Sequence, residues 1–395
     1  MTLSREVLKE FGANLGFNFS EILDRPLAKP YWVFISLSHN CNLDCQMCGV
    51  KKILRNQELD ADLVKKNLDE VAGWHSDCVV LFTGGEPFLR KDIFDIIGHS
   101  VSLGLKTEVV TNGSQITDPA IVAKIIGSGL GNIAVSLDGF NPQTHDFIRG
   151  IRGAHSKAVD AISCLSREKR AKGVGPQISA WTTIMKENIG ELYEIIGLAE
   201  EIGVECLVYH PVIVAQDDMQ NTLKAGRFWL DTKDIDVLTA EIEKIRAYQK
   251  KNGLVAFLHD PYLWIKYFKN TLTKEDWRCN PFVFIDIGPD GDVRSCGPAF
   301  GNVKEMSLTE TLHTPQASKA RRRMQCCQKP CLQTCWARPE VDNLAAMVED
   351  FIQKIENSVI RSEEKSRMIK EGLALLAGYE DLLAKERKNI HGRQT

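Results

Sequence analysis

The run Cys41-Asn42-Leu43-Asp44-Cys45-Gln46-Met47-Cys48 places three cysteines within eight residues, in the spacing C-x3-C-x2-C. It directly follows an apolar, strand-like stretch, residues 31–37. Three thiolates on one short loop can converge on a single small object, and thiolates suit soft iron sites. A cubane cluster has four irons, so three protein ligands would leave one iron open for chemistry. The alternatives are a zinc loop and unrelated buried cysteines, but zinc sites usually pair C-x2-C with a second such pair, and none lies close by.

The composition is that of a soluble globular protein, with 395 residues, 44% hydrophobic and 26% charged. The formal net charge of −3 gives no reason to expect nucleic acid as a partner. We find neither an apolar run long enough to span a membrane nor a secretory signal. We therefore expect a cytoplasmic protein whose twelve cysteines are thiols or metal ligands and not disulfides.

Strand-like and helix-like segments alternate along the first half of the chain. The apolar, β-branched-rich runs are residues 31–37, 78–83, 106–111, 132–137, 177–184 and 205–210. Helical periodicity marks residues 61–74, 91–103, 118–128, 154–172 and 188–202. Alternating βα units predict a parallel sheet. An open doubly wound sheet would fit the count, but candidate site residues follow the ends of several strands, which favours a partial (β/α)6 TIM barrel.

We expect an α/β protein with five regions in chain order. An N-terminal arm with a short amphipathic helix, residues 1–30, precedes the barrel, residues 31–215. A helical connection, residues 216–276, leads to a small, cysteine-rich α+β domain, residues 277–338. The remainder, residues 339–395, is charged and reads as a helical extension.

A second motif, Thr83-Gly84-Gly85-Glu86-Pro87, follows the second predicted strand. Paired glycines let backbone approach a ligand closely, and Glu86 with backbone carbonyls could accept hydrogen bonds from an ammonium group. An ordinary strand-to-helix turn is the alternative. Together with the cysteine spacing one βα unit earlier, this motif resembles the radical S-adenosylmethionine (radical SAM) enzymes. The resemblance implies that Gly84, Gly85, Glu86 and Pro87 hold the amino group of SAM.

The resemblance also implies SAM contacts from polar residues after later strands. Asn112 and Ser136 are candidates for the ribose or the carboxylate. Arg149 could pair with the carboxylate in a bidentate manner. Since His145 and Arg149 are four residues apart, they could instead form one solvated helix face.

Met47 stands where this family often carries an aromatic residue against adenine, and a thioether can fill that space. Further adenine contacts are expected near Tyr209 and His210. In such enzymes the open iron chelates SAM, one electron breaks the C5′–S bond, and a 5′-deoxyadenosyl radical removes a hydrogen atom from substrate. The cluster ligands that the resemblance implies are Cys41, Cys45 and Cys48.

A second cysteine group follows later in the chain. Cys279 and Cys296 flank a hairpin signal at residues 289–292. The other members of the group are Cys326, Cys327, Cys331 and Cys335. Their order resembles the SPASM or twitch extension of radical SAM enzymes, which binds auxiliary clusters.

We expect one auxiliary [4Fe–4S] cluster at this second group, held by Cys279 and Cys296 plus two of Cys327, Cys331 and Cys335. A structural zinc site could use the same thiolates and is the alternative. Sulfatase-maturing relatives carry an Asp base after the second hairpin cysteine. Gly297 occupies that position here, so their activity is not expected.

The sequence therefore predicts a radical SAM enzyme that abstracts hydrogen from a small molecule or peptide, leading to oxidation or bond formation. A flavodoxin- or ferredoxin-type protein would supply the electron. The short arm before the barrel favours a small molecule, or a peptide delivered by a partner. One alternative is a non-enzymatic iron–sulfur electron carrier or redox sensor, which would not cleave SAM. Another is a radical methyltransferase, which would release S-adenosylhomocysteine.

Overall fold

The computed structural model describes residues 3–49, 57–74, 78–213, 227–256, 260–273, 275–277, 279–327, 332, 344–358 and 361–391. Within them, one sheet has the strand order β10-β9-β8-β1-β2-β3-β4-β5-β6-β7. Six neighbouring strands are parallel: β1 (Trp32–Ser36), β2 (Val79–Thr83), β3 (Lys106–Thr111), β4 (Asn132–Ser136), β5 (Gln177–Ile184) and β6 (Cys206–Pro211). This arrangement confirms the predicted partial barrel.

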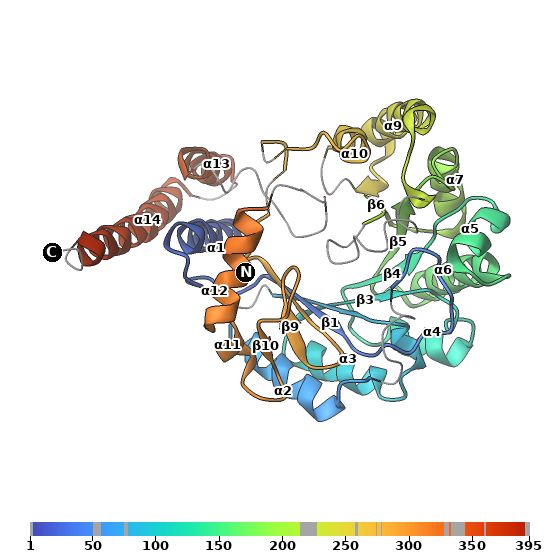
Figure 1. Ribbon diagram of the computed structural model, residues 1–395, viewed down its shortest axis with the longest axis horizontal. Coiled ribbons are helices and arrows are strands. Elements are labelled where there is room, and N and C mark those ends of the chain that lie inside the picture. Colours follow the sequence, from blue (N-terminus) through green and yellow to red (C-terminus); the bar gives the residue numbers. More distant parts are fainter. Residues whose placement is uncertain are drawn as a thin grey trace.

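Helices cover the outer face of these strands (Figure 1). They are α2 (Ala61–Ala72), the 3-10 turn η2 (Pro87–Leu89), α3 (Ile93–Ser102), α4 (Pro119–Ile126), α5 (Pro142–Arg149), α6 (Ala154–Lys172) and α7 (Leu192–Ile202). Asp60 begins α2 by accepting hydrogen bonds from the backbone N–H groups of Asp62 and Leu63. Because the six strands pair in parallel, they all run in the same direction and end at the same rim of the barrel.

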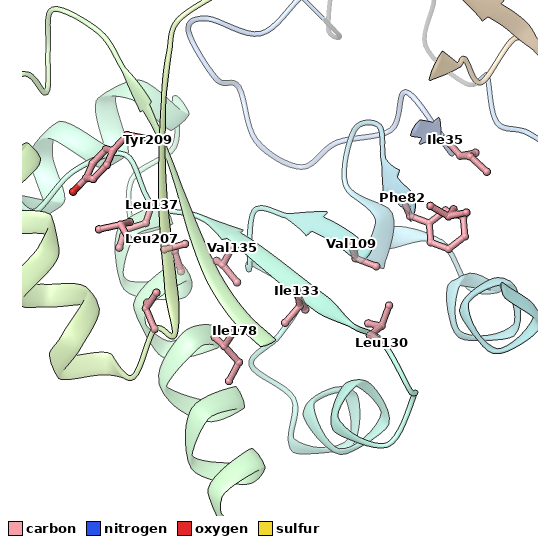
Figure 2. Close-up of a cluster of buried hydrophobic side chains, with 14 of the residues drawn as sticks. Ile35, Phe82, Val109, Leu130, Ile133, Val135, Leu137, Ile178, Leu207 and Tyr209 are labelled. Atoms are coloured by element: carbon pink, nitrogen blue, oxygen red, sulfur yellow. The ribbon is translucent and has the colours of Figure 1, made fainter. Parts of the chain in front are cut away.

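The main core lies between the sheet and these helices. Side chains alternate along each strand, so Val33 and Ile35 of β1 are fully buried while Phe34 and Ser36 keep partial exposure on the opposite face. Figure 2 shows the core side chains of several strands, among them Ile35 and Ile133. Each such burial contributes about 1.5–3 kcal/mol. The opposite face of the strands lines the interior of the barrel.

The cysteine-rich region continues the barrel sheet. Strand β8 (Phe284–Ile287) pairs in parallel with β1, and β9 (Asp292–Arg294) and β10 (Gly301–Asn302) follow it in antiparallel pairing. The predicted turn at residues 289–292 joins β8 to β9, and Gly291 there has a φ of 91°. At the other edge, β6 pairs with β7 (Val255–Ala256), between α9 (Thr232–Asn252) and α10 (Tyr262–Phe268).

The two ends of the chain meet in a helical cluster beside the barrel (Figure 1). Its helices are α1 (Leu3–Leu23), α13 (Leu344–Glu356) and α14 (Ser362–His391). Helix α12 (Pro315–Gln325) contacts the end of α1, whereas the short α11 (Leu308–Thr311) contacts α2 and β10. Phe11 stacks on Phe351 with ring centroids 4.2 Å apart, and Phe19 stacks on Tyr379 at 5.1 Å. Within the described part of the chain, no helix has the length and apolar character needed to cross a membrane.

Candidate active site

A cavity of about 320 Å3 opens at the rim where the parallel strands end. Cys41, Cys45 and Cys48 all line it. The described lining contains no fourth cysteine. Three soft thiol donors on one cavity fit a cubane cluster whose fourth iron is left for another ligand. Of the other predicted site residues, the structure brings these to the same cavity: Met47, Gly84, Gly85, Asn112, Ser136 and Arg149.

The glycine motif holds the cysteine loop from one side. The backbone N–H of Gly85 donates to the carbonyl of Ser38 at 2.6 Å, and that of Glu86 donates to the carbonyl of Asn40 at 2.8 Å. A Cβ atom on Gly85 would lie 2.0 Å from the Asn40 oxygen, and one on Gly84 would lie 2.5 Å from the Ser38 oxygen. The glycines therefore allow close approach to the cysteine loop as well as to the cavity.

The end of α5 holds the same loop from the other side. The backbone N–H of Asp44 donates to the carbonyl of Arg149 at 3.1 Å, and that of Gln46 donates to the carbonyl of Ile148 at 2.8 Å. Gly150 ends the helix with a φ of 73°, and a Cβ atom there would lie 2.0 Å from the Asp44 oxygen. The three cysteines thus stand on a loop that is clamped between two elements distant in sequence.

The carboxylate of Glu86 is buried and hydrogen-bonded to other groups of the protein. It is 1% exposed, and it accepts hydrogen bonds from the Thr111 hydroxyl at 2.7 Å and from the backbone N–H groups of Asn112 at 2.8 Å and Phe88 at 3.1 Å. Burial raises the pKa of Glu86, and these hydrogen bonds oppose the rise. Neither Glu86 nor the buried Pro87 is among the residues that line the cavity, and the hydrogen bonds of Glu86 fasten the glycine turn to the end of β3.

Asn112 ties the third strand end to the cysteine loop. Its amide nitrogen donates to the Asn42 side-chain oxygen at 3.0 Å and lies 3.9 Å from the Cys41 sulfur. Its own oxygen accepts from the backbone N–H of Ser114 at 2.8 Å, and the Asn42 amide donates to the Ser114 hydroxyl at 2.8 Å. This closed set of hydrogen bonds orients both asparagines beside the first cluster cysteine.

Arg149 is buried between a carboxylate and a cysteine. Its Nη2 atom lies 2.5 Å from Oδ2 of Asp138, which is fully buried, and its Nη1 atom lies 3.9 Å from the sulfur of Cys45. Oδ1 of Asp138 accepts from the backbone N–H of Thr183 at 2.8 Å. Burial raises the pKa of Asp138, and the guanidinium of Arg149 opposes that rise. The sequence analysis named Arg149 as a site residue but missed its partner Asp138.

His145 belongs to the support of this ion pair. It is 1% exposed, and its Nδ1 atom accepts from the backbone N–H of Asp138 at 3.1 Å. Burial holds the pKa of His145 well below its usual range, so the ring stays neutral. His145 and Arg149 therefore do not form a solvated helix face.

Strand β6 directs the two candidate adenine-contacting residues, Tyr209 and His210, to opposite faces. His210 lines the cavity, where Nε2 lies 3.2 Å from the hydroxyl of Thr183. Tyr209 points the opposite way into the core, and its hydroxyl donates to the carbonyl of Leu192 at 2.6 Å (Figure 2). Because neighbouring residues of a strand face opposite sides, His210 is the one of these two residues that could contact a ligand in the cavity.

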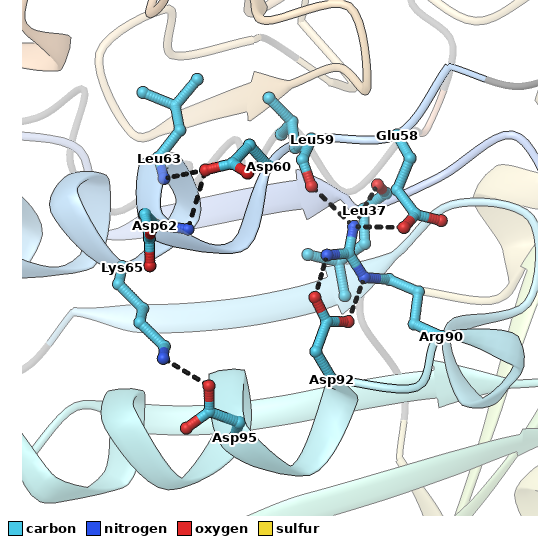
Figure 3. A network of polar contacts seen from close by, with 10 residues as sticks. All are labelled: Leu37, Glu58, Leu59, Asp60, Asp62, Leu63, Lys65, Arg90, Asp92 and Asp95. Atoms are coloured by element: carbon cyan, nitrogen blue, oxygen red, sulfur yellow. Dashed lines mark hydrogen bonds and ion pairs between the residues drawn. The ribbon is translucent and has the colours of Figure 1, made fainter.

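Arg90 is a support residue that the sequence analysis did not identify (Figure 3). Its Nη1 atom donates to the carbonyls of Leu37 at 3.1 Å and Leu59 at 2.8 Å, and it pairs with Asp92 through Nε and Nη2. Glu58 lies 3.6 Å from the same guanidinium. The contact with Leu37 fixes the chain where β1 leads into the cysteine loop. The available signal was the position of Arg90, three residues after the end of the glycine motif.

Two of the auxiliary cysteines pack beside side chains of β1 and β8. Cys279 and Cys296 are half-buried and border one small apolar cluster with Phe284 of β8 and Met324 of α12. Cys326 caps α12 and is exposed, whereas the following Cys327 is half-buried. The remaining two predicted ligands, Cys331 and Cys335, lie outside the described residues. The placed thiols fit a second cluster site beside the barrel.

Sequence profiles of two known families match the chain. That of the radical SAM superfamily matches residues 35–207, and that of the SPASM iron–sulfur cluster-binding domain matches residues 279–337. The first contains the three cysteines of the cavity, and the second contains all six of the second group. The second match favours an iron–sulfur cluster over zinc.

Curated relatives include enzymes with different substrates. An AdoMet-dependent heme synthase from Methanosarcina barkeri is 34% identical over 183 residues, 46% of this chain and 50% of that protein. Mycofactocin maturase MftC from Mycolicibacterium smegmatis is 30% identical over 184 residues, 46% and 45% of the two chains. This chain thus spans about half the length of these relatives. A PqqA peptide cyclase from Xanthomonas axonopodis pv. citri is 26% identical over 73% of this chain and 75% of that one.

Solved structures show the same fold. SuiB from Streptococcus suis, bound to its precursor peptide SuiA, superposes with a TM-score of 0.60 at 16% identity, covering 75% of this chain and 67% of SuiB. The protein anSMEcpe, with AdoMet and the Cp18Cys peptide bound, gives 0.57 at 15% identity, covering 89% and 99%. Radical SAM domains bind SAM and a [4Fe–4S] cluster, and SPASM domains bind auxiliary clusters. The chain therefore carries a radical SAM domain at residues 35–207 and a SPASM-type cluster-binding domain at residues 279–337.

Proposed function

We propose that this protein cleaves SAM reductively and abstracts a hydrogen atom from a peptide or small-molecule substrate, which is then oxidised or forms a new bond. The observation that carries the proposal is the cavity at the strand ends. It is lined by three cysteines and by polar side chains of several strands. A bound cluster would supply the electron for cleavage of the sulfonium. The protein would orient SAM and keep water away from the reacting carbon.

Individual residues take separate tasks in this proposal. Cys41, Cys45 and Cys48 hold the first cluster. The backbone of Gly84 and Gly85 faces the SAM amino group, and the residues proposed to contact the rest of SAM are Met47, Asn112, Ser136, Arg149 and His210. Arg149 presents the donors that Asp138 leaves free, since a guanidinium has five N–H groups.

The substrate class rests on the relatives. PqqA peptide cyclase and SuiB with its bound SuiA are associated by name with peptides, and the heme synthase with a small molecule. We infer that a flavodoxin- or ferredoxin-type protein delivers the electron. Gly297 after Cys296 remains a reason to expect an activity other than sulfatase maturation.

Anaerobic reconstitution tests the proposal directly. The protein should bind about eight irons, from two cubane clusters, and release 5′-deoxyadenosine from SAM on reduction with dithionite. Cys45→Ala should abolish this release. Cys296→Ala should spare it at least in part, and Cys164→Ala, a half-buried cysteine on α6, serves as the control.

Three results would contradict the proposal. Intact SAM in the presence of a fully reconstituted, reduced cluster would indicate an electron carrier. Accumulation of S-adenosylhomocysteine would indicate a methyltransferase. Equal loss of activity in folded Cys45→Ala and Cys296→Ala would contradict the division of roles between the two clusters.

A further inference from the structure

The end of the N-terminal helix is fastened to α12 by one carboxylate. Asp24 follows α1 and accepts hydrogen bonds from the Ser318 hydroxyl at 2.8 Å and from Nε of Arg322 at 2.7 Å. Nε of Arg321 lies 3.9 Å away. Asp24 has a φ of 49°, in the left-handed region that costs energy for a residue with a side chain. These contacts hold the backbone in that conformation.

Helix α12 leads directly to the auxiliary site. It ends at Gln325, and Cys327 follows within one turn. Its residue Met324 packs in the same small apolar cluster as Cys279 and Cys296. The orientation of α12 therefore sets where Cys327 stands relative to the two hairpin cysteines.

The arginines of α12 also contact the segments that carry those two cysteines. Arg323 lies against Gly297, where a Cβ atom would be 2.9 Å from its Nη1 atom, directly after Cys296. The Arg321 guanidinium lies 4.9 Å from the ring centroid of Phe282, shortly after Cys279. Phe282 is itself 4% exposed and belongs to the aromatic cluster of α1. Helix α1 thus reaches the auxiliary segments by two routes, through Phe282 and through Asp24.

We propose that Asp24 is a positioning residue for the auxiliary cluster. Its carboxylate compensates neighbouring guanidinium charges on α12 and fixes this helix, from whose end the chain continues to Cys327. This inference rests on the proposed function only in taking these three cysteines as auxiliary ligands. Groups that orient metal ligands from outside typically change metal affinity by about 10–100-fold when they are removed.

The test compares Asp24→Asn with Asp95→Asn. Asn keeps the size of the side chain and also tolerates the left-handed conformation, so this variant removes the charge and one of the two acceptor oxygens. Asp95 pairs with Lys65 on an exposed surface of the barrel and is the matched control. Both substitutions are made in the 395-residue chain in which Cys41, Cys45 and Cys48 are replaced by alanine. In this parent variant the first cluster cannot form, so all bound iron belongs to the auxiliary site.

We expect Asp24→Asn to release iron to a chelator on the order of tenfold faster than the parent and to alter the EPR spectrum of the reduced cluster. Asp95→Asn should do neither. Unchanged iron release and an unchanged spectrum in Asp24→Asn would overturn the inference. A Cys296→Ala variant in the same background distinguishes an error in the assigned ligands from an error in the role of Asp24. If Cys296→Ala keeps its iron, the assignment of the auxiliary ligands is wrong. If it loses iron while Asp24→Asn does not, only the role of Asp24 is refuted.

Discussion

Gly85→Ala tests how the cysteine loop is held. The added Cβ atom would lie 2.0 Å from the backbone oxygen of Asn40, while an ordinary contact needs at least 3.4 Å. The two backbone segments would therefore have to separate by about 1.4 Å, since neither is a flexible side chain that could give way. Cluster ligands tolerate displacements of only about 0.2 Å. The substitution should therefore damage the cluster site as well as stability.

The expected loss of stability can be estimated from the contacts. Overpacking of this kind costs about 1–3 kcal/mol, and each of the two backbone hydrogen bonds from Gly85 and Glu86 to the cysteine loop is worth about 1 kcal/mol. We expect Gly85→Ala to lower the free energy of unfolding by about 3–5 kcal/mol, or to detach the loop at a smaller cost. Anaerobic urea denaturation of the metal-free chain measures the first outcome. The iron content after reconstitution measures the second.

Two helical glycines provide controls for Gly85→Ala. Gly98 in α3 and Gly197 in α7 have open space around the position of a Cβ atom. Alanine there should stabilise the protein by about 0.5–1 kcal/mol, because it favours the helix. If Gly85→Ala matched these controls in both unfolding and iron content, the clamp described for the cysteine loop would be refuted.

Two further predictions concern carboxyl groups whose pKa is raised by desolvation. Burial raises the pKa of Asp286 from 3.8 to about 6. The folded state therefore favours the neutral carboxyl group. The stability that this group contributes to the fold is highest below pH 3.8, where the group is also neutral in the unfolded chain, and it is lost as the pH rises through 6. Asp286→Asn should therefore gain stability relative to the parent across this window, by up to about 3 kcal/mol at pH 7, and parallel unfolding curves from pH 4 to pH 7 would contradict this. Asp138→Asn leaves Arg149 buried without its partner and should cost about 3–5 kcal/mol in urea denaturation, whereas the exposed pair of Asp95 is worth at most about 1 kcal/mol. Equal small losses in these two variants would show that the Asp138 ion pair does not stabilise the fold.

Local sequence patterns predicted most of the barrel elements. The expected strands at residues 106–111 and 177–184 and the expected helix at residues 154–172 coincide with β3, β5 and α6. Apolar periodicity indicates which side of a helix or strand is buried. In a chain of βα units, the buried side nearly determines which strands and helices pack against each other. The spacing of the cysteines and the position of the glycine motif one unit later likewise predicted the cavity residues.

Contacts between segments distant in sequence were not predictable in this way. Trp32 of β1 pairs with Phe284 of β8, so the cysteine-rich region extends the barrel sheet. The N-terminal helix joins α13 and α14, and Asp24 reaches α12. None of these partners is marked by a local pattern, since a strand edge or a carboxylate can pair with many equivalent groups elsewhere.

The sequence by itself determined the chemistry of the first site, because three thiols on one short loop have few alternative uses. Only the tertiary structure decided how that loop is held. It showed that the Glu86 carboxylate is buried and hydrogen-bonded to Thr111 and Asn112, and it gave Arg149 a buried carboxylate partner. The physical reason is that residue type limits which atoms can donate or accept, whereas the partner is chosen by the packing of the whole chain, which brings one donor within reach and excludes the rest.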